Sequence, residues 1–169
     1  TEVIEPQYGI YQHDDFALTG YRRGINFDTD EKDVLFNRYK AESDSKIEKI
    51  GFYTTKKNAE YEVYLIPDFN RFASDAKDLG EDEAEEFYKM VQQYKVLSGI
   101  ADNAGYHTLD IPADEAISLT KGKDFAVGIW TRNSDAEDPD HKYDMVVEEK
   151  NIMGQGKNAK VGKKETYIY

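Results

Sequence analysis

The sequence of 169 residues predicts a single all-β domain, a sandwich or a barrel, that spans residues 1–169 and carries a short helical insertion. Three observations favour this fold class. Short runs with strand-like composition recur along the chain, with turn-forming residues between them. Tyrosine is frequent, with 13 residues against 8 Phe and 1 Trp, and its ring packs on a pleated surface while its hydroxyl stays hydrated. The length suits one domain that buries a sizeable core.

The predicted strands are distributed along the whole chain. In the first half they lie within residues 8–12, 33–42, 46–55 and 60–66. The last two of these runs are joined by the short polar loop "KKNA" and are expected to pair as a hairpin. In the second half they lie within residues 105–111, 124–133, 143–149 and 165–169. About ten short strands at this spacing are typical of a sandwich or barrel.

One segment, residues 67–87, is predicted to be a partly helical insertion. Apolar residues recur there at helical spacing, namely Phe69, Phe72, Ala73 and Ala76. The run "EDEAEEFYKM" is rich in helix formers, and its acidic residues stand at the N-terminal end, where the helix dipole favours them. The favoured interpretation is that these acids promote solubility and cap the helix. The alternative is that they bind a basic neighbouring domain or a cation. A strand is expected after Phe87.

Composition and charge exclude several classes of function. The formal net charge of −12 repels phosphate backbones, so a nucleic-acid partner is not expected. No apolar run approaches the roughly 20 residues that span a bilayer, so membrane insertion is not expected. The sequence has no cysteine, which excludes disulfides, thiolate metal sites and a cysteine nucleophile. No signal peptide is recognisable, and the start at Thr1 is interpreted as that of a mature fragment or of a piece excised from a longer chain.

The sequence contains no recognisable catalytic motif. Its three histidines are His13, His107 and His141, but the patterns Gly-x-Ser-x-Gly and His-Glu-x-x-His are missing. The 34 acidic residues show no spacing that singles out a pair for glycoside hydrolysis. We therefore expect no enzymatic activity of this chain.

The run "GYHTLDI" carries residue types that are also common in active sites. Alternation along a strand places Tyr106, Thr108 and Asp110 on one face and His107 and Leu109 on the other. The apolar end of the second face is expected to point inward. His107 is therefore interpreted as a hydrogen-bonded residue at the margin of the core and not as a catalytic base. Tyr106 and Asp110, on the outer face, are candidate ligand-binding residues.

Exposed aromatic rings stack on the apolar faces of sugars, so two further side chains are candidate ligand-binding residues. Trp130 lies on the face of its strand opposite Val127, where it either forms a platform or, in the favoured alternative, packs in the core or under the insertion. Tyr64 is expected to be exposed, because Val63 and Leu65 are expected to face inward. Cross-strand packing is the alternative for every strand tyrosine. The other tyrosines considered are Tyr21, Tyr53 and Tyr143.

Several runs, taken in order, carry a family resemblance. They are "FYTT" followed by "YEVYLI", then "GYHTLDI" followed by "SLTKGKDFAVGIW", and finally "MVVEE" and "ETYI". Together they resemble the lectin-like domain attached to papain-like cysteine proteases and other cell-surface proteins of Gram-positive bacteria and archaea. The resemblance implies a jelly-roll-like sandwich of two antiparallel sheets, displayed outside the cell, at its surface or in its wall.

The resemblance leaves two functions open. The first is binding of a glycan or cell-wall polymer, or adhesion. The second is a structural accessory role, in which the domain positions a neighbouring cysteine protease or wall-anchor domain of the same polypeptide without binding sugar. Fold analogy alone does not decide between them.

The resemblance also implies a structural calcium ion, which at least one branch of the family holds. Jelly-roll modules often bind calcium where the terminal strands meet, which implies ligands such as Asp14, Asp28 and Glu148. The loop "NSDAEDPD" offers Asp135 and Asp138 as hard oxygen ligands. That loop lacks the EF-hand pattern, and a solvated acidic loop is the favoured interpretation.

Overall fold

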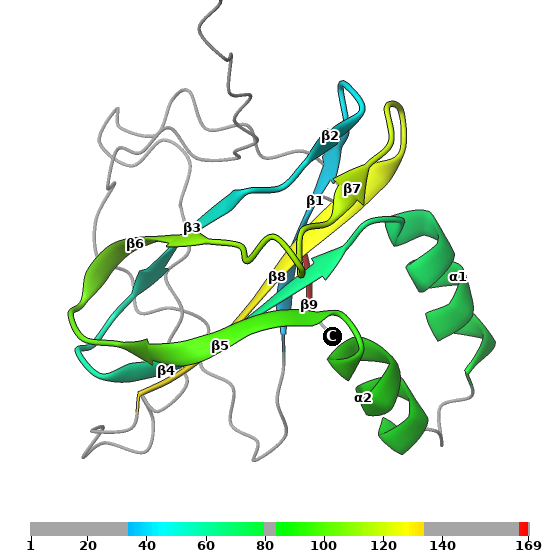
Figure 1. Ribbon diagram of the computed structural model, residues 1–169. Coiled ribbons are helices and arrows are strands. Elements are labelled where there is room, and N and C mark those ends of the chain that lie inside the picture. The colour runs from blue at the N-terminus through cyan, green and yellow to red at the C-terminus, as the bar shows by residue number, and fades with distance from the viewer. Residues whose placement is uncertain (1–33, 80–83, 134–165, 169) are drawn as a thin grey trace, which may run out of the picture. The chain divides into compact units, whose positions relative to one another are not determined.

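The computed structural model describes residues 34–79, 84–133 and 166–168 (Figure 1). The described residues belong to one of the two compact units into which the chain divides. The strands are β1 Leu35–Lys40, β2 Ser45–Lys46, β3 Lys49–Thr54, β4 Ala59–Ile66, β5 Lys95–Ala101, β6 Gly105–Asp110, β7 Ser118–Leu119, β8 Asp124–Asn133 and β9 Thr166–Ile168. The helices are α1 Phe69–Asp78 and α2 Ala84–Gln92. The antiparallel, mostly β fold is confirmed, and the jelly-roll arrangement stays a prediction.

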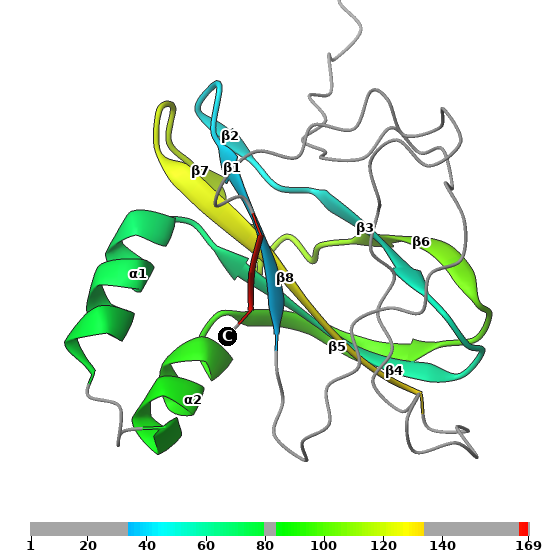
Figure 2. The same cartoon turned by 180° about the vertical axis from the view of Figure 1, so that it is seen from behind.

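The largest sheet has five strands in the order β5-β4-β8-β1-β9, and all of its pairs are antiparallel. Figure 2 shows β9 beside β1, the strand with which it pairs. The long strand β8 lies inside the sheet, between β4 and β1. Gly128 of β8 stands opposite Phe36 of β1, and a Cβ atom at this glycine would lie 2.7 Å from Cδ1 of the Phe36 ring. Glycine therefore leaves room for a buried aromatic ring to lie against the sheet.

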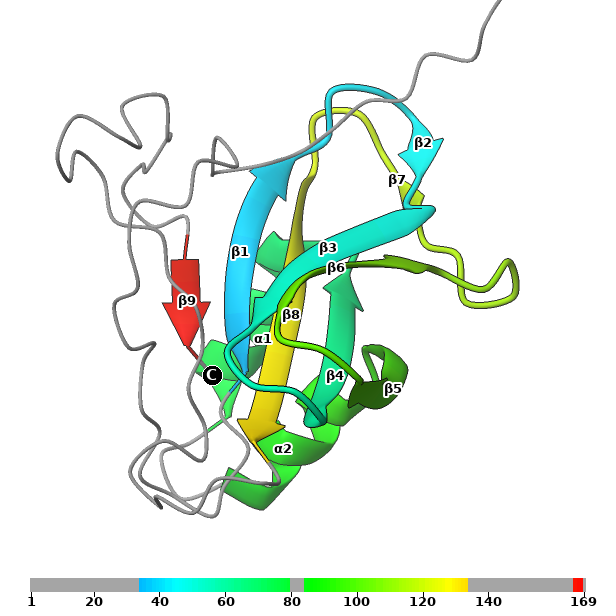
Figure 3. The same ribbon diagram turned by 90° about the vertical axis from the view of Figure 1, so that its left-hand side faces the viewer.

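A second, two-stranded sheet consists of β3 and β6 and lies over one face of the five-stranded sheet (Figure 3). Ile50 and Phe52 of β3 are buried and pack with Val63 and Leu65 of β4. The predicted hairpin between residues 46–55 and 60–66 is therefore wrong. Both runs have an apolar face, and these two faces meet across a core, so the chain crosses from one sheet to the other through a turn in which Asn58 has a φ of 56°.

The two helices cover the opposite face of the five-stranded sheet (Figures 1 and 3). Phe72 of α1 and Val91 of α2 are buried in one cluster with Trp130 of β8. The predicted change from helix to strand at Phe87 is wrong, because α2 continues to Gln92 and β5 begins at Lys95. The reason is helical spacing: the apolar residues of this segment recur every three or four positions and pack against the same cluster. They are Phe87, Met90, Val91 and Tyr94.

A partly buried ion pair between Arg38 and Asp124 ties β1 and β8 to the first helix. The Asp124 side chain is 9% exposed and accepts a hydrogen bond of 2.8 Å from Nε of Arg38. The guanidinium of Arg38 also lies over the Phe69 ring, 5.5 Å from its centroid. A buried carboxylate needs such a partner, because desolvation disfavours its charged form.

Helix α1 begins at an N-cap whose removal is expected to cost about 1 kcal/mol of stability. The carboxylate of Asp68 accepts a hydrogen bond of 3.2 Å from the Arg71 backbone N–H and lies 3.2 Å from Nζ of Lys123. The hydrogen bond, aided by the ammonium group, lowers the pKa of Asp68. Because this pKa is lowered on folding, the stabilisation is present above the ordinary pKa of aspartate and is lost as the pH falls through the lowered value.

Urea denaturation of the wild type and of Asp68→Ala at pH 7 and in acid measures this contribution. The difference between the two proteins should be present at pH 7 and shrink in acid. The control is Asp75→Ala on the same helix. It removes an exposed ion pair in which Nε of Arg71 lies 3.9 Å from a carboxylate oxygen of Asp75. Its effect should stay within about 0.5 kcal/mol. An equal loss in both variants would contradict the capping role.

Candidate functional site

Two of the aromatic candidates are buried. Trp130 is 6% exposed and packs in the cluster under the helices, as in the alternative favoured from the sequence. The prediction that Tyr64 is exposed is wrong, because its exposure is 0%. The helices cover this face of β4, and the Tyr64 hydroxyl donates to the Glu62 carboxylate and accepts from Nε2 of Gln92 at 2.8 Å. Burial, together with Glu62, raises the pKa of Tyr64. Neither ring is available to stack on a ligand in solution.

The other two candidates, Tyr106 and Asp110, lie on the outer face of β6, and the predicted alternation along this strand is confirmed. Pairing with β3 places Tyr106 opposite Tyr53 and Asp110 opposite Lys49. We call this outer surface the tyrosine face. It is formed by Lys49, Gly51, Tyr53, Tyr106, Thr108 and Asp110.

The tyrosine face combines an aromatic centre with a charged end. The rings of Tyr53 and Tyr106 have centroids 4.9 Å apart and planes at 57°. Tyr106 is 45% exposed, and its phenol lies against Gly51, where a Cβ atom would collide with it. At the end of the face, Nζ of Lys49 lies 3.4 Å from a carboxylate oxygen of Asp110. Partly exposed rings bordered by hydrogen-bonding groups are the combination that sugars require.

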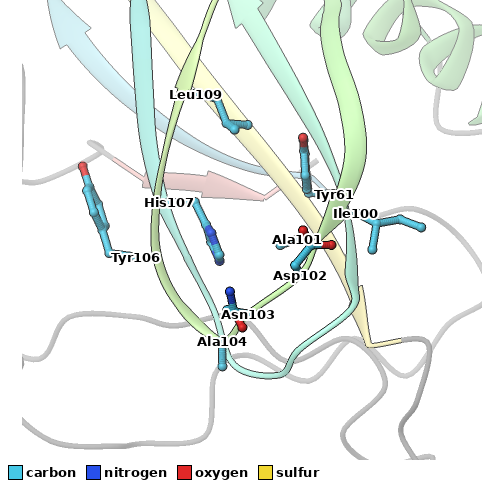
Figure 4. Close-up of a pocket in the computed structure, with 9 residues that line it drawn as sticks. All are labelled: Tyr61, Ile100, Ala101, Asp102, Asn103, Ala104, Tyr106, His107 and Leu109. Atoms are coloured by element: carbon cyan, nitrogen blue, oxygen red, sulfur yellow. The ribbon is translucent and has the colours of Figure 1, made fainter.

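A cavity of about 330 Å³ lies at the turn between β5 and β6, and we call it the turn cavity. Figure 4 shows His107 and Tyr106 on opposite sides of β6, with His107 directed toward the turn. Tyr61, from β4, forms part of another wall, and Asp102 and Asn103 belong to the turn itself. This cavity has no signal in the local sequence pattern, because it depends on a turn that connects strands of two different sheets.

His107 is held by a hydrogen bond beside the turn cavity. Its Nε2 atom lies 2.8 Å from the hydroxyl oxygen of Thr54, which is 2% exposed. The imidazole also packs on the Phe52 ring, with centroids 5.6 Å apart. The prediction that His107 is a hydrogen-bonded residue at the margin of the core is confirmed.

The candidate metal ligands, Asp14, Asp28, Asp135, Asp138 and Glu148, all lie outside the described residues. Within residues 34–79, 84–133 and 166–168, no group of three or more His, Cys, Asp or Glu side chains could hold a metal ion. The calcium site therefore stays a prediction. Among the described helices, none is both long enough and apolar enough to cross a membrane.

Comparison with known proteins identifies the family. A family model described as "Lectin like domain" matches residues 10–169, which is nearly the whole chain. The chain belongs to the lectin-like domain family. The resemblance stated from the sequence motifs is thereby confirmed. No curated protein matches this lectin-like domain.

Similar solved structures include two that cover most of this lectin-like domain. One is the crystal structure of the cysteine protease and lectin-like domains of Cwp84, a surface layer associated protein of Clostridium difficile. It is 22% identical, with a TM-score of 0.53, and the match covers 82% of this chain and 26% of that one. The other is clostridial cysteine protease Cwp84 after propeptide cleavage. It is 24% identical, with a TM-score of 0.52, and the match covers 81% of this chain and 29% of that one. This likeness shows the fold.

Proposed function

We propose that this lectin-like domain is a non-catalytic module, displayed at the cell surface or in the cell wall, that binds carbohydrate on its tyrosine face. The observation that carries the proposal is the exposed Tyr106 ring beside Tyr53, with the Lys49–Asp110 pair at the end of the same face. The likeness to the lectin-like domain of a surface layer associated protein supports a surface role. The jelly-roll-like sandwich that the resemblance implies is part of this proposal.

A glycan array of bacterial surface polysaccharides tests carbohydrate binding. We expect the wild type to bind at least one glycan class and Tyr106→Ala to bind it about fivefold to tenfold more weakly, because a stacking ring contributes about 1 kcal/mol. Tyr88→Ala is a matched control, since Tyr88 of α2 is 44% exposed and Tyr106 is 45% exposed. Its affinity should equal that of the wild type. An array without any bound glycan would contradict the proposal.

A second function has its own support. The chain spans 26% and 29% of the two similar structures, and one of these contains a cysteine protease domain together with the lectin-like domain. The alternative is therefore a structural accessory domain that positions a neighbouring protease or wall-anchor domain of the same polypeptide. In that case no glycan binds, and removing the lectin-like domain from the longer protein lowers the melting temperature of its neighbour.

A structural calcium ion remains part of the proposal, with Asp14, Asp28 and Glu148 or the loop of Asp135 and Asp138 as its ligands. A folded-state ligand at 100 times its dissociation constant adds about 2.7 kcal/mol to the free energy of unfolding. We expect the melting temperature to rise on addition of calcium and to fall with a chelator. Magnesium at the same concentration is the control. An unchanged melting temperature would remove calcium from the proposal.

A further inference from the structure

The turn cavity has a rigid aromatic wall. The Tyr61 ring packs against Phe52, with centroids 5.2 Å apart, and lies over Gly99 of β5, its partner in the antiparallel register. A Cβ atom at Gly99 would lie 2.8 Å from Cζ of Tyr61, so glycine leaves space for the ring. Contacts with Phe52 and Gly99 therefore hold Tyr61 in place before any ligand binds. This lowers the entropic cost of ordering the Tyr61 side chain on binding.

Hydrogen bonding around Thr54 determines which nitrogen of His107 carries the proton. The Thr54 hydroxyl lies 3.2 Å from the backbone carbonyl of Asn103 and 2.8 Å from Nε2 of His107. A hydroxyl has one hydrogen to donate, and a carbonyl can only accept. Both contacts are hydrogen bonds when Thr54 donates to Asn103 and Nε2–H of His107 donates to Thr54. In the neutral imidazole the lone pair is then on Nδ1, which can accept a hydrogen bond.

The second acceptor of the turn cavity is the carboxylate of Asp102, an exposed residue of the β5–β6 turn. A neutral sugar hydroxyl can donate to such groups, but an ammonium group brings three donors and a positive charge. The formal net charge of −12 also attracts cations toward the molecule. The chemistry of the turn cavity thus favours a ring that carries an amine.

We propose that the turn cavity is a subsite for a sugar ring with a free amino group, which stacks on Tyr61 and donates to His107 Nδ1 and to Asp102. This inference rests on the proposed function, because it assigns the chemistry of one subsite next to the tyrosine face. Tyr106 borders both surfaces, so one oligosaccharide can contact the two of them.

Calorimetric titration with two matched oligosaccharides tests the inference. Oligomers of β-1,4-linked glucosamine and of β-1,4-linked N-acetylglucosamine have the same backbone and differ in whether the amine is free. We expect the wild type to bind the glucosamine oligomer about tenfold more tightly, as one charge-assisted hydrogen bond implies. Asp102→Asn should abolish this preference by weakening the binding of the glucosamine oligomer.

Two further variants separate the subsite from general charge attraction. Asp75→Asn makes the same charge change on α1, away from the turn cavity, and should preserve the preference. Thr54→Val removes the hydroxyl that positions His107, at a residue outside the proposed ligand contacts. It should therefore reduce the preference for the glucosamine oligomer. Trp130 fluorescence and the melting temperature establish that each variant is folded.

The outcomes distinguish this inference from the proposed function. Equal affinity for the two oligomers, a preference that survives Asp102→Asn, or a preference lost equally in Asp75→Asn overturns the amine subsite. In each of these cases the proposed function stands if Tyr106→Ala still weakens both oligomers. If neither oligomer nor any other glycan binds, both proposals are overturned.

Discussion

Replacing Phe72 with alanine is expected to lower the free energy of unfolding by about 3–5 kcal/mol. Phe72 is fully buried, and its ring lies 6.0 Å from Phe36, 5.7 Å from Tyr94 and 6.4 Å from Phe87, measured between centroids. Truncation leaves a cavity between α1, α2 and the sheet that these rings cannot fill without losing their own contacts. Urea denaturation followed by the fluorescence of Trp130, which lies in the same cluster, measures the loss.

This substitution tests whether the helical insertion is part of the core or an attachment to it. Tyr88→Ala, at a half-exposed position of α2, is the control and should change the stability by less than about 1 kcal/mol. If Phe72→Ala proved equally mild, the helices would contribute little to the core, and the burial of Tyr64 and Trp130 beneath them would need another cause.

The second large effect is expected at a glycine. Gly128→Ala should destabilise the protein by about 1–3 kcal/mol, because the added methyl group enters the space of the buried Phe36 ring. Phe36 is enclosed between the sheet and the helices, with Tyr64 and Phe72 as ring neighbours, so it has no free space into which it could move. Thermal and urea unfolding measure the loss.

Gly51→Ala makes the same chemical change on the other sheet and serves as the matched comparison. Its methyl group would meet the phenol of Tyr106, but this side chain is 45% exposed and can rotate into solvent. We expect a stability loss well below that of Gly128→Ala and a weaker affinity for any glycan that binds the tyrosine face. Equal losses of stability at the two glycines would contradict this distinction.

Local pattern was sufficient to predict strands and their faces, but not what covers each face. The predicted run of residues 124–133 agrees with β8, and the alternation around His107 is confirmed. Alternation separates two faces, and with Val63 and Leu65 on the inner face it predicts Tyr64 on the solvent side. The helices cover the remaining face, and that packing depends on contacts between α2 and β4 that no local pattern encodes.

Strand pairing limited the prediction of the candidate site in the same way. Alternation alone predicts that Tyr106 and Asp110 lie on an outer face, whereas their neighbours Tyr53 and Lys49 depend on the register between β3 and β6. A nearby run was the obvious partner for β3, since short loops favour hairpins. Instead, β3 packs face to face on β4, with Phe52 buried against Val63 and Leu65, so β3 cannot also pair with β4 edge to edge.

The position of β8 has a consequence for how the chain acquires its structure during synthesis. β8 separates β4 from β1 in the sheet, although it follows both of them in sequence, and it pairs Val63 and Leu35 with the same residue, Ile129. Closing such long loops before any contact forms is slow, and it exposes unpaired strand edges in the meantime. The ribosome must therefore release most of this domain before the five-stranded sheet can assemble. Until β8 emerges, β1 and β4 must stay soluble without their central partner.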